Sequence, residues 1–233
     1  MRPRTGPTFL RPGRAPAFPD PRGADDDGLL AIGGDLSVAR LLLAYESGVF
    51  PWYGPELPPL WWCPDPRGVI EIEDLHVSRS MRRFLRRRDF ELTWNQSFHQ
   101  VMHACGQERD AGTWIIPEME RAYGRLHELG HAHSLEVWSG GQLVGGLYGV
   151  QRGALFAAES MFHRMQNASK VALITAVRSL FTQGIELFDV QFTTPHLISL
   201  GARDVSRNEY LRRLAAARLR RLDLSDIRLT VVE

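Results

Sequence analysis

The chain has 233 residues, 44% of them hydrophobic, and its 28 basic and 27 acidic side chains leave a formal net charge of +1. This length allows one large domain or two small ones, and the composition is that of an ordinary globular protein. No apolar stretch approaches the ~18 residues of a membrane-spanning helix, so no membrane partner is expected. Residues 1–22 mix arginine with proline and have no apolar core, which excludes a secretory signal and predicts a flexible leader of a cytoplasmic protein.

The next part of the chain predicts a helix followed by a long aromatic loop. A helix is expected from about 38 to 47, because Leu41, Leu42 and Tyr45 share one face and Gly48 can end it. Residues 50–68 contain six prolines and three tryptophans. Such a segment is not helical and is too rich in proline for a central strand. We expect a loop that its aromatic side chains hold in order.

A strand and three helices are expected next. The strand spans 69–73, and the first helix runs from Ser78 to about residue 88, with Met81, Phe84 and Leu85 on one face. The other two helices span 96–105 and 117–129, and the last of these begins at a proline and stops before a glycine.

The second half of the chain predicts a sheet crossed by a helix. Three strands are expected at 133–138, 142–151 and 154–162, then a helix at 168–183, a parallel strand at 185–192 and a helix at 207–221. This order resembles the core of a GNAT-type acyltransferase. The expected fold class is therefore α+β, with a small N-terminal α+β domain (1–72) and a GNAT-like acyltransferase domain (73–233).

Seven motifs, in order along the chain, resemble those of the leucyl/phenylalanyl-tRNA–protein transferase family. They are FPWY (50–53), WWCPDPR (61–67), GTWI (112–115), LHELGHAHSLEVW (126–138), LVGGLYGV (143–150), ESMFHRMQNASK (159–170) and SLGA (199–202). The resemblance runs from about residue 28 to 214. It implies an enzyme that takes Leu or Phe from Leu-tRNA or Phe-tRNA and joins it to proteins with N-terminal Arg or Lys, creating an N-degron. Cys63, residues 193–195 and the segment 1–22 depart from the family's pattern.

The resemblance implies a donor site between the loop of Trp52 and the sheet. Trp52 and Trp114 match the family's adenine-binding tryptophans, and stacking on an aromatic ring is worth ~1–3 kcal/mol per base. From the residues alone, both also suit core anchors of the proline-rich loop. Leu147, Phe156 and Phe188 lie on neighbouring expected strands and form a candidate pocket for the aminoacyl side chain. From the residues alone, a plain sheet core is favoured for all three.

An arginine-rich helix is the candidate contact with tRNA. Its six arginines are Arg79, Arg82, Arg83, Arg86, Arg87 and Arg88, with no acidic residue among them. A run of charge is usually a solvated helix face. Contacts to phosphates supply sequence-independent affinity, so with the family resemblance we expect this helix to bind tRNA. All other basic residues except Lys170 are also arginines.

The candidate catalytic pair is Asp189 and Gln191, which alternate along a strand and so face one side. From the residues alone, they also fit a carboxylate and an amide at the end of a strand that form hydrogen bonds with nearby backbone groups. The α-amine of the acceptor has a pKa of ~7.7–8.0, so a useful fraction of it is already neutral and able to attack the ester. The reaction then needs only orientation of the amine and a hydrogen-bond acceptor for its proton. Gln191, polarised by Asp189, is the expected acceptor. Glu159, with Asp189 nearby, is the candidate site for the cation of the protein acceptor. Without substrate we expect Glu159 to lean to water, with an ion pair to Arg164 or Lys170 as the alternative.

Two other functions remain open on the sequence. A CoA-dependent N-acetyltransferase needs a glycine loop around the pyrophosphate. The corresponding turn, 164–169, has no glycine, although Asn167 can adopt a left-handed conformation. A non-catalytic RNA-binding module would keep the arginine helix but would need no Glu159. Because the two cysteines form no CxxC motif and the histidines are scattered, neither a metal nor a cofactor is expected.

Overall fold

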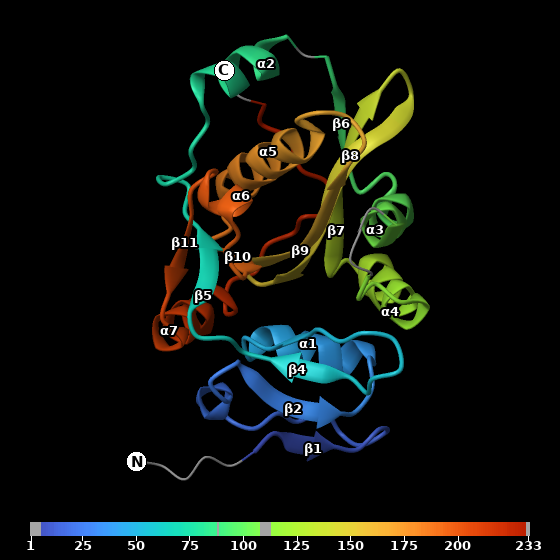
Figure 1. Ribbon diagram of the computed structural model, residues 1–233, viewed down its shortest axis with the longest axis vertical. Helices are drawn as coiled ribbons and strands as arrows, with labels where there is room; N and C mark the ends of the chain where they lie inside the picture. The colour runs from blue at the N-terminus through green and yellow to red at the C-terminus, as the bar shows by residue number, and fades with distance from the viewer. Residues whose placement is uncertain (1–5, 88, 108–112, 232–233) are drawn as a thin grey trace.

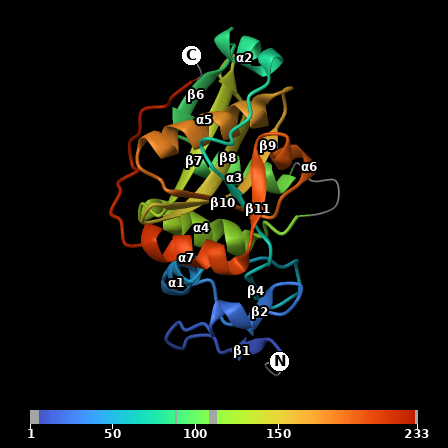
Figure 2. The same ribbon diagram turned by 90° about the vertical axis from the view of Figure 1, so that its left-hand side faces the viewer.

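A computed structural model of the chain describes residues 6–87, 89–107 and 113–231 (Figures 1 and 2). Over these residues the structure is mixed α/β, with a four-stranded sheet of order β1-β2-β4-β3 and a seven-stranded sheet of order β11-β5-β10-β9-β8-β7-β6. The smaller sheet lies at the N-terminal end of the molecule in Figure 1. No helix in these ranges is long and apolar enough to cross a membrane.

The first part of the chain builds the smaller sheet. Its elements are β1 (Thr8–Leu10), the 3-10 helix η1 (Pro21–Gly23), β2 (Leu29–Gly33), α1 (Val38–Glu46), β3 (Phe50–Pro51) and β4 (Leu60–Trp62). β1 pairs with β2 in parallel, and the ring of Phe18 meets that of Trp61 edge-on at 4.9 Å. Arg40, which is buried, donates to the backbone carbonyls of Arg11 and Arg14. The prediction of a flexible leader is therefore wrong for residues 8–22.

The aromatic loop is ordered, as its composition indicates. Trp61 is fully buried, and its indole N–H donates to the carbonyl of Gly33 at 2.8 Å. The indole N–H of Trp62 donates to the carbonyl of Trp52 at 2.6 Å. β3 has only two residues and forms the edge of its sheet, where a proline removes no ladder bond.

The rest of the chain builds the larger sheet and its helices. The elements are β5 (Arg67–Ile70), α2 (Arg79–Arg86), β6 (Glu91–Trp94), α3 (Phe98–Gln107), α4 (Pro117–Glu128), β7 (Ala132–Ser139), β8 (Gln142–Arg152), β9 (Leu155–His163), α5 (Ala168–Thr182), β10 (Leu187–Gln191), α6 (Pro195–Ile198), β11 (Ala202–Val205) and α7 (Arg207–Ala217). The expected helices and the strands of the second half are present. β5 lies between β10 and β11 in the larger sheet, although its residues fall inside the segment expected to form the N-terminal domain.

Two helical layers enclose the larger sheet (Figure 1). α5 packs on one face, and α1, α3 and α4 pack on the other. β7, β8 and β9 are antiparallel, and β10 returns parallel to β9 after α5. The pairing of β9 with β10 covers only Leu155–Ala157 and Leu187–Asp189. Beyond these residues the two strands are no longer paired.

A candidate active site where two strands part

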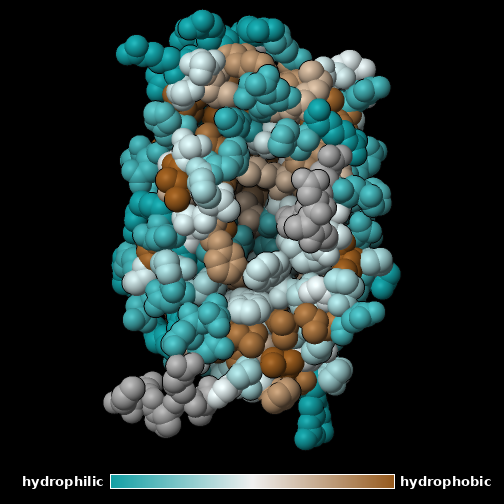
Figure 3. Space-filling model, viewed as in Figure 1, coloured by the Kyte–Doolittle hydropathy of each residue, from teal (hydrophilic) through white to brown (hydrophobic). Residues whose placement is uncertain are grey.

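The parting of β9 and β10 is marked by one bulge in each strand. Glu159 is an additional residue of β9, because Ala158 pairs with Gly149 and Ser160 pairs with Tyr148. Val190 is additional in the same way where β10 pairs with β5. Bulges bend a strand and redirect its side chains. A cavity of about 430 Å³ opens here, and Figure 3 shows a hollow near the middle of the face where α6, β9 and β10 lie in Figure 1.

One wall of the cavity is apolar and comes from separate elements. It consists of Leu147 of β8, Met161 of β9, Leu173 of α5, Val190 of β10 and Leu197 of α6. These side chains offer no hydrogen-bonding group, so the wall suits an apolar side chain and selects it by shape.

Phe156 and Phe188 do not line this cavity, although the sequence predicted them in the aminoacyl pocket. They are registered opposite each other in the part of the sheet where β9 and β10 are still paired. Both are fully buried, with ring centroids 5.5 Å apart, and Phe156 also meets Trp94. The cavity begins one step further along each strand, so of the three predicted pocket residues only Leu147 reaches it.

Trp52 and Trp114 both line the cavity, although they come from distant loops. Trp52 is 44% exposed, and its ring lies 5.8 Å from those of Trp62 and Phe192. A large aromatic side chain left this exposed beside a cavity is available to a flat ligand.

Glu159 lies at the polar end of the cavity, half-buried, and does not lean into open solvent. The hydroxyl of Tyr123 donates to its Oε2 at 3.4 Å, and the hydroxyls of Tyr45 and Tyr123 are 2.6 Å apart. Loss of hydration raises the pKa of Glu159 to about 8, against the opposing hydrogen bonds of the two tyrosines. The same burial raises the pKa of both tyrosines, which keeps them as neutral donors.

The alternative of an ion pair to Arg164 or Lys170 does not describe this carboxyl. Arg164 donates to the carbonyl of Leu143 at 3.4 Å and lies over the ring of Phe162. Within the described residues, Glu159 forms no ion pair and is contacted by hydroxyl and amide groups, while Arg67 acts on it only through its field.

Asp189 does not reach the cavity, which corrects its expected role as an acceptor-binding residue. It is fully buried, and Arg67 donates to both of its oxygens, at 2.8 and 2.6 Å. Tyr210 adds a hydrogen bond at 2.9 Å. Arg67 also donates to the carbonyl of Gly48 and lies over Phe50, so the pair ties β10 to the N-terminal segment. Both oxygens of Asp189 are therefore occupied by hydrogen bonds within the protein.

Gln191 is the residue that Asp189 positions. Its backbone N–H donates to Asp189 Oδ1 at 2.9 Å, and its φ of 57° is in the left-handed region that residues other than glycine seldom adopt. Its amide NH2 is best satisfied by the carbonyls of Ala158 at 3.0 Å and Val190 at 3.1 Å. The amide oxygen then lies 3.5 Å from Glu159 Oε1, a contact that favours a protonated carboxyl.

The arginine helix is present as α2. Ser78 caps it by accepting from the N–H of Met81, while Met81 and Leu85 are buried. Its exposed arginines are Arg79, Arg82, Arg83, Arg86 and Arg87. Arg87 pairs with Asp89 at 2.8 Å, and Arg88 lies outside the described residues. The helix stands at the end of the molecule opposite the smaller sheet in Figure 1.

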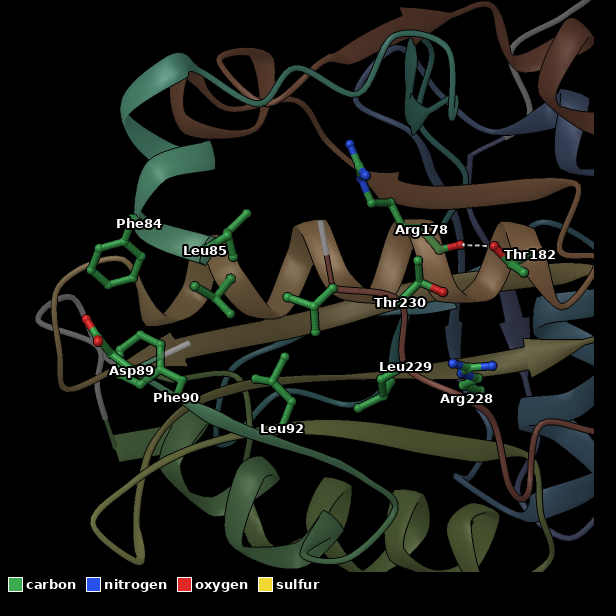
Figure 4. Close-up of a pocket in the computed structure, with 12 residues that line it drawn as sticks. Phe84, Leu85, Asp89, Phe90, Leu92, Arg178, Thr182, Arg228, Leu229 and Thr230 are labelled. Carbon is green, nitrogen blue, oxygen red and sulfur yellow. Dashed lines mark hydrogen bonds between the residues drawn. The ribbon is translucent and has the colours of Figure 1, made fainter. Parts of the chain in front are cut away.

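A larger cavity, of about 850 Å³, lies beside α2, and neither Glu159 nor Gln191 lines it. Figure 4 shows side chains around it from α2 (Phe84, Leu85), α5 (Arg178, Thr182) and the C-terminal segment (Leu229, Thr230). It contains none of the candidate catalytic or adenine-binding residues, so size alone does not identify the site.

Several site residues were not anticipated from the sequence. Met161, Leu173 and Leu197 complete the apolar wall, and Tyr45 and Tyr123 support Glu159. Leu173 carried a signal, since it lies on the helix that crosses the sheet. The two tyrosines carried none beyond their place on apolar helix faces, which indicates core.

Comparison with known proteins gives first the class and then the family. A model described as leucyl/phenylalanyl-tRNA protein transferase matches residues 69–215, and the model of its N-terminal domain matches residues 34–65. Proteins named leucyl/phenylalanyl-tRNA--protein transferase from Citrobacter koseri and Shigella sonnei are 52% and 53% identical over 208 residues, which is 88% of this chain and 89% of each relative. The protein is thus an enzyme of the aminoacyltransferase class. The chain belongs to the leucyl/phenylalanyl-tRNA–protein transferase family, which confirms the resemblance in its motifs.

Distant likeness to solved structures was also found. An aminoglycoside acetyltransferase from an uncultured soil sample is 15% identical and covers 45% of this chain and 80% of its own, with a TM-score of 0.36. A score this low carries no argument about the fold or the function.

Proposed function

We propose that this enzyme transfers Leu or Phe from Leu-tRNA or Phe-tRNA to the α-amine of proteins whose N-terminal residue is Arg or Lys, creating an N-degron. The observation that carries the proposal is a single cavity with three kinds of surface: two tryptophans, an apolar wall, and the polar pair Glu159 and Gln191. A GNAT-like domain of residues 73–233 behind a small N-terminal domain (1–72) belongs to the same proposal. So does a cytoplasmic location, where aminoacyl-tRNA is made.

The donor occupies the tryptophans and the apolar wall together. The terminal adenine stacks on Trp52 and Trp114, each such contact being worth ~1–3 kcal/mol. The Leu or Phe side chain enters the wall formed around Leu147, Met161 and Leu173. The selection among apolar side chains is modest, because one methylene is worth only ~1–3 kcal/mol. Phosphates of the tRNA body are bound by α2 through its exposed arginines.

The reaction forms a peptide bond at the ester carbon of the donor. The neutral α-amine of the acceptor attacks this carbon, and the bond to the ribose oxygen breaks. The amine loses one proton, and the leaving ribose oxygen gains one, passed by the vicinal ribose hydroxyl. The amide oxygen of Gln191 accepts a hydrogen bond from the attacking amine and orients it. Asp189, held by Arg67, fixes the backbone from which Gln191 extends.

Glu159 binds the positively charged side chain of the acceptor's N-terminal residue. Its pKa of about 8 means that the carboxyl of the empty enzyme is mostly protonated near pH 7. An Arg or Lys side chain beside it favours the charged form and lowers that pKa. Binding of the acceptor cation is therefore coupled to release of a proton from Glu159.

A CoA-dependent N-acetyltransferase is the second candidate, and one observation supports it. Asn167 adopts a left-handed conformation, with φ 69° and ψ −5°, immediately before α5. The absence of glycine therefore does not prevent the turn that a pyrophosphate loop requires. A non-catalytic RNA-binding module has no use for a carboxyl and an amide converging in a cavity.

Parallel incubations with two donors test the proposal. Labelled Leu-tRNA and labelled acetyl-CoA are each offered to a peptide with N-terminal Arg, and to the same peptide with its α-amine acetylated. We expect label in the free-amine peptide from Leu-tRNA only. Transfer from acetyl-CoA alone would support the second candidate, and transfer from neither would leave only the RNA-binding function.

A further inference from the structure

The single lysine of the chain lies beside the candidate active site. Lys170 is in the first turn of α5 and is half-buried. Leu173, three residues further along, lines the cavity. Residues three apart share a face of a helix, so Lys170 lies on the side of α5 that faces the cavity, one turn closer to the start of the helix.

Two histidines lie on the same side of the cavity as Lys170. His163 ends β9 two residues after Met161, which lines the cavity, and alternate residues share a face of a strand. His196 lies in α6 beside Leu197, another lining residue. Burial lowers the pKa of His196, and the proximity of Lys170 and His163 lowers it further. The three side chains therefore form one group, which we call the basic rim.

Among the described residues, the carboxyl nearest to the basic rim along the chain is Glu159, which lines the same cavity and is mostly protonated near pH 7 because its pKa is raised to about 8. The segments that carry the rim, 160–173 and 192–201, contain no Asp or Glu. Within the described ranges, none of the three side chains forms an ion pair with an acidic residue. The start of α5 adds partial positive charge, because Asn167 makes no side-chain hydrogen bond to cap it. Lys170 carries the charge of this group, and the lowered pKa of His196 leaves its imidazole neutral near pH 7, with one N–H to donate. A lysine charge beside the start of a helix attracts an anion.

We propose that the basic rim, and Lys170 above all, binds the phosphodiester that joins the terminal adenosine of the donor to the preceding nucleotide. This inference rests on the proposed function. With the adenine on the tryptophans and the aminoacyl group against the apolar wall, the third direction from the ribose is its 5′ carbon. That carbon carries the nearest phosphate of the donor. One phosphate charge beside one lysine also makes the contact independent of nucleotide sequence.

Two minimal donors that differ only in the charge of this linkage test the proposal. Both are leucyl esters of the dinucleotide cytidylyl-adenosine, one with the natural phosphodiester and one with a neutral methylphosphonate. We expect the wild-type enzyme to use the charged donor with a kcat/KM about tenfold higher, the effect of one charge-assisted contact. Lys170→Gln should remove this preference, while turnover of leucyl-adenosine stays unchanged.

Salt dependence and a matched variant complete the test. The phosphodiester donor should show a salt slope of roughly −0.7, as one single-stranded phosphate contact gives, and Lys170→Gln should flatten it. Arg86→Gln, on α2, should weaken the use of whole tRNA only.

Three outcomes would count against one or other proposal. Equal use of the two dinucleotides by the wild type overturns the phosphate site. So does a loss in Lys170→Gln that is equal for every donor, since this indicates a structural lysine. Failure of the wild type with all aminoacyl donors would refute the proposed function itself.

Discussion

Replacing Glu159 with Gln should change how the stability of the enzyme depends on pH. Loss of hydration raises the pKa of this carboxyl from 4.5 to about 8 in the folded protein. The unfolded chain therefore releases the proton near pH 4.5, and the folded chain holds it until about pH 8. Between these pH values deprotonation stabilises the unfolded state only, so the free energy of unfolding of the wild type falls as the pH rises. A glutamine side chain at position 159 has no proton to release, so its contribution to the free energy of unfolding does not change with pH.

The size of the effect follows from the two pKa values. At 1.36 kcal/mol per pH unit, the interval from 4.5 to about 8 corresponds to about 5 kcal/mol. Because Glu159 is half-buried and open to the cavity, water reduces this cost. Between pH 5 and pH 9, we expect the free energy of unfolding of Glu159→Gln to rise by roughly 2 to 5 kcal/mol relative to that of the wild type, with most of the rise complete by pH 8.

Urea unfolding followed by tryptophan fluorescence at pH 5, 6, 7, 8 and 9 measures this directly. The difference between variant and wild type cancels every other titrating group, since both proteins share them. A difference that stays constant from pH 5 to 9 would mean that Glu159 titrates normally, and the reasoning from burial would be refuted.

The same carboxyl should control the choice of acceptor. The ratio of kcat/KM for a peptide with N-terminal Arg to that for its neutral citrulline analogue should rise with pH up to about 8, as Glu159 loses its proton. The α-amine is common to both peptides, so its own titration cancels. Glu159→Gln should lower kcat/KM for the Arg peptide by roughly 30-fold or more and abolish the rise. A variant that keeps the full preference for Arg would show that the cation is bound elsewhere.

Three further predictions concern the rest of the structure. Changing Arg83 and Arg86 to Glu should weaken the binding of whole tRNA and flatten its salt dependence, with turnover of leucyl-adenosine nearly unchanged; equal loss with both donors would argue for misfolding. Trp52→Ala should raise KM for both donors, whereas an effect on thermal stability alone would make the tryptophan a core residue. Arg67→Met leaves Asp189 buried without its cation and should lower the free energy of unfolding in urea by about 3–5 kcal/mol. A change below 1 kcal/mol would contradict that last expectation.

The long elements were predictable because their patterns repeat. α5 and the strands β7 to β9 extend over enough residues for a period to be visible. β6, α6 and β11 have four residues each, too few to show a period, and they were missed. The leader was misjudged because its order comes from a neighbouring strand and from Arg40, neither of which is local in sequence.

The candidate site was predictable in part for similar reasons. Residue types with evident chemistry, such as Trp52, Glu159 and Gln191, were identified from motifs, and the structure brings them to one cavity. The partner of Asp189 lies 122 positions away along the chain, and nothing local indicates that Arg67 occupies both of its oxygens. Pairing over such distances depends on the assembled sheet.

The bulges at the parting of β9 and β10 have a consequence for how the enzyme can change. Glu159 is the extra residue of the bulge in β9. Its neighbours Ala158 and Ser160 pair with Gly149 and Tyr148, and Glu159 itself pairs with no residue of β8. Removing that one residue would leave a regular strand with every other partner in place. The carboxyl is thus separable from the architecture, so a chain lacking it should still fold. Only the opening between the strands, and the chemistry within it, would be lost.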